Sequence, residues 1–151
     1  MKRPVIIEII SCLLIALFVY AAVAKIMDMQ QFQIQLGKSP LLTSFSTLVS
    51  FAVPAIEVII SLTLVLPRFR LFGLYASFSL MLLFTLYIIA ILHLDKNIPC
   101  SCGGILEKMG WKEHLVFNSV FTLIAIVAVL IYPGTHSKNS MIYEKYLPAG
   151  K

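Results

Sequence analysis

Charged side chains are scarce in this sequence: of its 151 residues, 13% are charged and 60% are hydrophobic. A soluble domain averages about 25% charged residues, and it could not hide this much apolar surface from water. The scarcity excludes a soluble globular fold and indicates an integral membrane protein. The basic residues give a net charge of +5, but they lie between apolar runs and form no stripe suited to nucleic acid.

Internal repeats and low-complexity tracts are also absent, and the chain leaves no room for a separate soluble domain. What it has is four apolar runs, at residues 5–24, 44–66, 71–92 and 113–132. About 20 helical residues at about 1.5 Å each cross a hydrocarbon core of about 30 Å. We therefore predict an all-α polytopic membrane four-helix bundle over residues 1–134, with Pro133 and Gly134 ending the last helix. Residues 135–151 are predicted to form a polar cytoplasmic tail.

The basic residues favour one orientation of these spans. Four spans put both termini on the same side, which carries seven Lys and Arg residues against five on the other side. The positive-inside rule then predicts cytoplasmic termini. The connection between the third and fourth spans is therefore expected on the extracytoplasmic side, where disulfides form and are exchanged.

The connection after the first span has the pattern of a short amphipathic helix. Met29, Phe32 and Leu36 recur at helical spacing with glutamines between them, which predicts a helix lying on the bilayer surface. Lys25, at the mouth of the first span, is either an interfacial anchor or a functional cation. Cys12, deeper in that span, is expected to be a buried packing residue.

Glu57 lies near the middle of the second span, just after Pro54. An acid at that depth costs about 2.5 kcal/mol or more if it faces lipid. We expect it to face the bundle interior, either protonated or paired, and a functional role and a structural hydrogen bond both stay open. Lys25 is the nearest basic candidate, but residue counting along the two spans places it several helical turns away, so no firm pair is predicted.

The most distinctive stretch is residues 99–104, Pro-Cys-Ser-Cys-Gly-Gly, which holds two of the three cysteines. Proline before the pair and glycines after it favour a tight turn that water can reach. A disulfide within Cys100-Ser101-Cys102 would close a short, strained loop, and strained exposed disulfides are the labile ones. This favours thiol–disulfide exchange. Capture of a soft metal such as Cu(I) or Zn is the competing use, although the spacing matches no zinc motif.

Three residues that follow the turn share one helical face. Trp111, His114 and Asn118 are spaced three and four apart at the start of the fourth span. His114 can deprotonate a nearby thiol or stabilise its thiolate, with Asn118 orienting the imidazole. The alternative is that these side chains simply face lipid headgroups.

With these residues in hand, the chain resembles the MauE/DoxX-like redox-associated membrane proteins, named for methylamine utilisation. The resemblance is carried by Ala24-Lys25-Ile26, by the Pro54-Ala55-Ile56-Glu57 stretch, and by residues 99–104 with Trp111, His114 and Asn118. Many members have Phe where this chain has Gly103. The resemblance extends from the first span to the fourth.

The resemblance implies a four-helix bundle related in architecture to vitamin K epoxide reductase-like proteins, in a bacterial inner membrane. It implies electron or disulfide transfer, as by a thiol–disulfide oxidoreductase, to thioredoxin-like or disulfide-containing extracytoplasmic partners. Cys100, Cys102 and His114 would be catalytic, with Trp111, Asn118, Glu57 and Lys25 in support. A quinone is the expected cofactor if there is one, although the chain lacks the second cysteine pair found near the quinone in those enzymes. A non-enzymatic assembly factor for a secreted redox protein and a metal-handling protein stay as alternatives.

Overall fold

The computed structural model of the chain describes residues 3–39, 42–94 and 110–146. Its helices are α1 (Arg3–Met27), α2 (Met29–Lys38), the short 3-10 helix η1 (Thr43–Phe45), α3 (Ser46–Val65), α4 (Arg70–Leu94) and α5 (Trp111–Tyr146). Within the described residues, four segments are long and apolar enough to cross a membrane: Val5–Met27, Thr43–Val65, Arg70–His93 and Lys112–Tyr132. The predicted all-α membrane bundle of four helices is confirmed.

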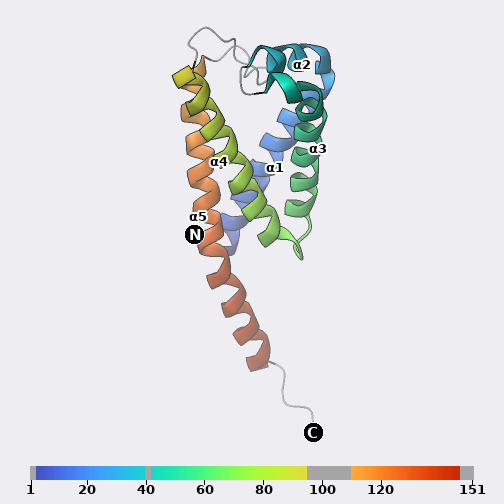
Figure 1. Cartoon of the computed structure of the whole chain (residues 1–151). Helices are drawn as coiled ribbons and strands as arrows, with labels where there is room; N and C mark the ends of the chain where they lie inside the picture. The colour runs from blue at the N-terminus through green and yellow to red at the C-terminus, as the bar shows by residue number, and fades with distance from the viewer. Residues whose placement is uncertain (1–2, 40–41, 95–109, 147–151) are drawn as a thin grey trace.

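The four long helices close into a ring (Figure 1). α1 packs against α3 and α5, and α4 packs against the same two helices. Gly73 permits a close approach of α4 to α3, because a Cβ atom there would lie 2.8 Å from Thr63 Oγ1 and 3.0 Å from the Leu64 backbone nitrogen. The ring leaves an interior that the inward faces of all four helices must fill.

The last helix is longer than the sequence predicted. α5 runs for 36 residues, through Pro133 and Gly134 to Tyr146, which corresponds to about 54 Å at 1.5 Å per residue. The prediction that Pro133 and Gly134 end the helix is wrong. Proline removes one backbone donor and one helical hydrogen bond, and α5, like α3 at Pro54, continues past that defect. Figure 1 shows α5 extending beyond the other helices.

The two halves of the bundle interior differ. The half nearest the chain termini is a packed apolar core, built from α1 (Ile7, Ile10, Leu14, Phe18), α3 (Ile60, Leu64), α4 (Leu74, Leu80, Met81) and α5 (Ala125, Ala128). The buried polar side chains of Lys25, Gln35, Glu57, His114 and Asn118 belong to the other half, toward α2. The first half supplies the apolar burial that stabilises the ring, and the second contains the candidate site.

α2 covers that polar half (Figure 1). The predicted amphipathic helix is present, but Phe32 and Leu36 on its apolar face are 6% and 4% exposed. The prediction that this face lies on the bilayer is therefore wrong, because it packs on the bundle interior instead. Two side-chain bonds hold the cover in place: Tyr87 Oη of α4 donates to Ser39 Oγ at 2.9 Å, and Gln33 Nε2 donates to Thr47 Oγ1 at 2.7 Å.

Cys12 also departs from expectation. The sequence suggested a buried packing residue, but the thiol is free and the residue is exposed on the outer face of α1. The inward face of this part of α1 is formed by Ser11, Leu14 and Phe18. Cys12 lies on the other face, which in a membrane-spanning helix meets lipid.

Candidate functional site

A cavity of about 390 Å³ lies inside the α2 half of the bundle. Its wall is mostly apolar, and it includes residues from α1, α2, α3, α4 and α5. Five aromatic side chains contribute to it: Phe18, Phe32, Phe84, Tyr87 and Phe117. The volume falls in the range of about 300–1,000 Å³ that is typical of small-molecule sites.

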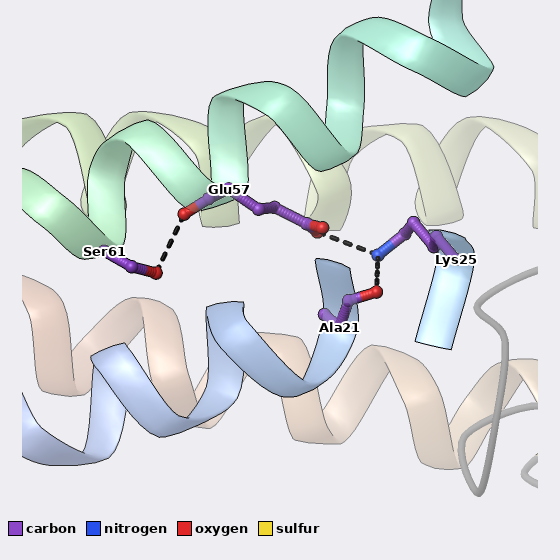
Figure 2. Close-up of polar contacts among 4 residues, drawn as sticks. All are labelled: Ala21, Lys25, Glu57 and Ser61. Atoms are coloured by element: carbon purple, nitrogen blue, oxygen red, sulfur yellow. Dashed lines mark hydrogen bonds and ion pairs between the residues drawn. The ribbon is translucent and has the colours of Figure 1, made fainter. Parts of the chain in front are cut away.

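An ion pair forms part of the cavity wall (Figure 2). Lys25 Nζ lies 2.8 Å from Glu57 Oε1 and donates a second hydrogen bond, of 3.3 Å, to the Ala21 carbonyl. The side chains are 8% and 1% exposed. The ammonium also lies 5.9 Å from the centre of the Phe32 ring, a cation–π distance that ties α2 to the pair.

The pair forms because the two side chains lean toward each other. Cα–Cβ bonds tilt toward the N-terminus of their own helix, and α1 and α3 run in opposite directions (Figure 1). Lys25, near the end of α1, therefore extends back along its helix to the level of Ala21, and Glu57 extends toward the start of α3 (Figure 2). Counting residues along the spans ignored this tilt, and the sequence analysis was wrong to leave the two residues apart.

The pair leaves one acceptor unused. Glu57 Oε2 is buried and has no hydrogen-bond partner among the described residues. The Glu57 carbonyl accepts a 2.8 Å bond from Ser61 Oγ one turn further on, which fixes the helix around the acid. An unsatisfied buried polar group costs about 1–3 kcal/mol. The carboxylate therefore presents an acceptor to whatever occupies the cavity.

The start of α5 brings His114 and Asn118 to the same cavity. Glu113 Oε2 accepts a 2.7 Å hydrogen bond from the Gly110 backbone N–H. The His114 backbone N–H donates a 2.9 Å hydrogen bond to the Gly110 carbonyl. The first bond is the glutamate half of a capping box, and the second is the first hydrogen bond of the helix. His114 and Asn118, one turn apart, are 5% and 4% exposed and both line the cavity. Neither side chain faces headgroups, which was the alternative interpretation.

Four of the seven residues singled out from the sequence thus meet at one cavity: Lys25, Glu57, His114 and Asn118. Asn118 was expected to orient the imidazole through a hydrogen bond. Its amide nitrogen does not do so, because Asn118 Nδ2 has no hydrogen-bond partner among the described residues. Trp111 begins α5, and its side chain lies outside the described residues, as do Cys100 and Cys102. The segment that holds the two cysteines joins Leu94 to Gly110, both at the α2 end of the bundle (Figure 1).

Sequence reasoning missed Tyr87. It lines the cavity and its hydroxyl binds Ser39 at the end of α2. The only signal was a tyrosine deep in an apolar run, where the hydroxyl needs a partner.

A metal site is not found among the described residues: residues 3–39, 42–94 and 110–146 offer no group of three His, Cys, Asp or Glu side chains that could hold a metal ion. The described cavity is suited to an organic molecule with hydrogen-bonding groups.

Comparison with protein-family models gives a match over most of the chain. The family model described as "Methylamine utilisation protein MauE" matches residues 3–131, which include the residues of the cavity and the four spans except for the last residue of the fourth. No curated protein and no solved structure matches the chain.

Proposed function

Because the chain belongs to the family of methylamine utilisation protein MauE, a bacterial membrane family, we propose that it is a membrane thiol–disulfide redox protein. Cys100 and Cys102 are the exchanging pair, and they pass electrons or disulfides to thioredoxin-like or disulfide-containing partners outside the cytoplasm. His114 assists by accepting a thiol proton, and Lys25, Glu57 and Asn118 belong to the same site. Trp111 is a supporting residue of the site.

One observation carries this proposal. The connection 95–109, which holds both cysteines, starts and ends at the end of the bundle that contains the polar cavity. His114, the residue suited to thiol activation, stands four residues beyond Gly110 and lines that cavity. A reactive dithiol needs a nearby base or positive charge, and this is the half of the bundle where the polar side chains are gathered.

The proposed orientation puts both termini in the cytoplasm of a bacterial inner membrane. It follows from the seven basic residues on the side of the termini against five on the other. The cysteine connection and the α2 cover are then extracytoplasmic. In that compartment a dithiol meets secreted proteins and an oxidising environment.

Labelling of intact cells tests orientation and redox state together. A membrane-impermeant maleimide is expected to modify Cys100 and Cys102 only after a reductant has opened their disulfide. Cys12 is expected to stay unmodified, because its exposed face lies within a membrane span, which a charged reagent does not enter. The modified residues are identified by mass spectrometry of the purified protein.

The matched control is the variant Cys100→Ser/Cys102→Ser, which should not be labelled under any of these conditions. Modification that requires disruption of the inner membrane would reverse the proposed orientation. Full modification without reductant would mean that the pair does not form a disulfide in the cell, contrary to the proposal.

A further inference from the structure

Two buried polar atoms of the cavity point to a ligand. Asn118 Nδ2 is a donor and Glu57 Oε2 is an acceptor, and neither has a hydrogen-bond partner among the described residues. Both side chains line the cavity, with 4% and 1% of their residue surface exposed. Buried polar groups in native proteins are nearly always paired. The two atoms come from different helices, α3 and α5, but both residues line the same cavity, so a single molecule there can meet both.

The Lys25 ammonium offers a further donor. It has three N–H groups, and two of them reach Glu57 Oε1 and the Ala21 carbonyl. The third can reach a group in the cavity, which Lys25 also lines. Asn118, Lys25 and Glu57 therefore present two donors and one acceptor to the cavity, within a wall that is mostly apolar and rich in aromatic rings.

We infer that this cavity binds a lipid-soluble quinone. A quinone is a flat ring with two carbonyl oxygens, which accept hydrogen bonds from Asn118 Nδ2 and Lys25 Nζ. Its reduced form has hydroxyl groups, one of which can donate to Glu57 Oε2. The ring packs against the aromatic side chains of Phe18, Phe32, Phe84 and Phe117.

Other lipid-soluble molecules fit the wall less well. A hydrocarbon chain would satisfy none of the buried polar atoms. A fatty acid would offer a carboxylate to Lys25, but it would have to compete with Glu57 for the ammonium at 2.8 Å. Its headgroup would also place like charge beside the Glu57 carboxylate. A neutral molecule with acceptor oxygens and an aromatic body avoids both conflicts.

The role of the quinone as an electron acceptor rests on the proposed thiol–disulfide function. The binding of quinone to the cavity does not. Disulfide formation between Cys100 and Cys102 releases two electrons and two protons, and reduction of a quinone to its quinol consumes both. The chain has no second cysteine pair to take these electrons. A quinone in the cavity would supply the acceptor.

Binding is tested with the full chain purified in detergent micelles and decyl-benzoquinone as the probe, by calorimetric titration and by the shift in unfolding temperature. Saturable binding of one molecule is expected. Decylbenzene, which lacks the carbonyl groups, and palmitate serve as competitors. Both are expected to bind at least about tenfold more weakly than decyl-benzoquinone, since loss of one good hydrogen bond corresponds to about tenfold in affinity.

Three variants locate the site. Asn118→Leu keeps the shape of the side chain but removes its donor, and is expected to weaken quinone binding about tenfold. Ala52→Phe, on the cavity wall, should abolish binding by filling space while leaving every polar group in place. Its control is Ala55→Phe, on the exposed face of the same helix, which should bind like the unaltered chain.

The outcomes separate this inference from the proposed function. Cys100→Ser/Cys102→Ser is expected to bind quinone with unchanged affinity, because binding does not need the thiols. If the unaltered chain fails to bind quinone, or binds decylbenzene or palmitate equally well, the inference is overturned while the redox proposal stands. Equal binding by the Ala52→Phe and Ala55→Phe variants would overturn the location.

Discussion

Glu57→Leu is expected to lower the free energy of unfolding by about 3–5 kcal/mol, because it leaves a buried ammonium without its counter-ion. The Lys25 and Glu57 side chains are 8% and 1% exposed and 2.8 Å apart, so both charges are largely removed from bulk water. Lys25→Met should cost a similar amount by stranding the carboxylate. The double variant Lys25→Met/Glu57→Leu should recover most of the loss, since it buries no unpaired charge.

The measurement is denaturant-induced unfolding in mixed micelles, followed by helical circular dichroism. Glu8 and Arg70 provide the matched control, because their groups lie 3.9 Å apart and the Glu8 side chain is 67% exposed. Glu8→Gln should change stability by no more than about 1 kcal/mol. An equal, small effect of Glu57→Leu and Glu8→Gln would show that the buried pair does not stabilise the fold.

His114→Ala is expected to slow the alkylation of Cys102, the thiol nearer to His114 in sequence, about tenfold near neutral pH, and little at alkaline pH. If His114 favours the thiolate by about one pKa unit, its loss raises the pKa of the Cys102 thiol and lowers the reactive fraction by that factor. At a pH above both pKa values the thiol is ionised in either protein, and the rates converge. The measurement is the pH dependence of alkylation of the reduced chain.

A second histidine provides the control for this experiment. His93 lies at the end of α4, before the cysteine connection, and it is exposed. His93→Ala should leave the alkylation profile unchanged. Coincident profiles for His114→Ala and the unaltered chain would remove His114 from the exchange reaction.

The sequence predicted the spans and the interior position of Glu57 because both depend on transfer free energies, which are local properties of the chain. Twenty apolar residues need a bilayer, and a mid-span acid needs an interior. His114 and Asn118 share a face for an equally local reason, since their spacing is one helical turn.

The remaining features depend on how helices meet. The Lys25–Glu57 pair follows from opposed side-chain tilt in two antiparallel helices, and the cover formed by α2 follows from space left between helix ends. Periodicity identified Phe32 and Leu36 as an apolar face, but it could not decide whether lipid or protein contacts that face. Cys12 was misassigned for the same reason, because both faces of a membrane helix are apolar.

Trapping of a mixed disulfide is the measurement that tests the redox proposal most directly. Cells that produce Cys100→Ser, Cys102→Ser or the double variant are quenched with acid, and free thiols are alkylated. If Cys102 forms the mixed disulfide with the partner and Cys100 resolves it, Cys100→Ser should accumulate a reductant-sensitive conjugate with an extracytoplasmic thioredoxin-like or disulfide-containing protein. The double variant should form none. Absence of any conjugate from both single variants, with the chains folded and the cysteines present as free thiols, would contradict the proposal.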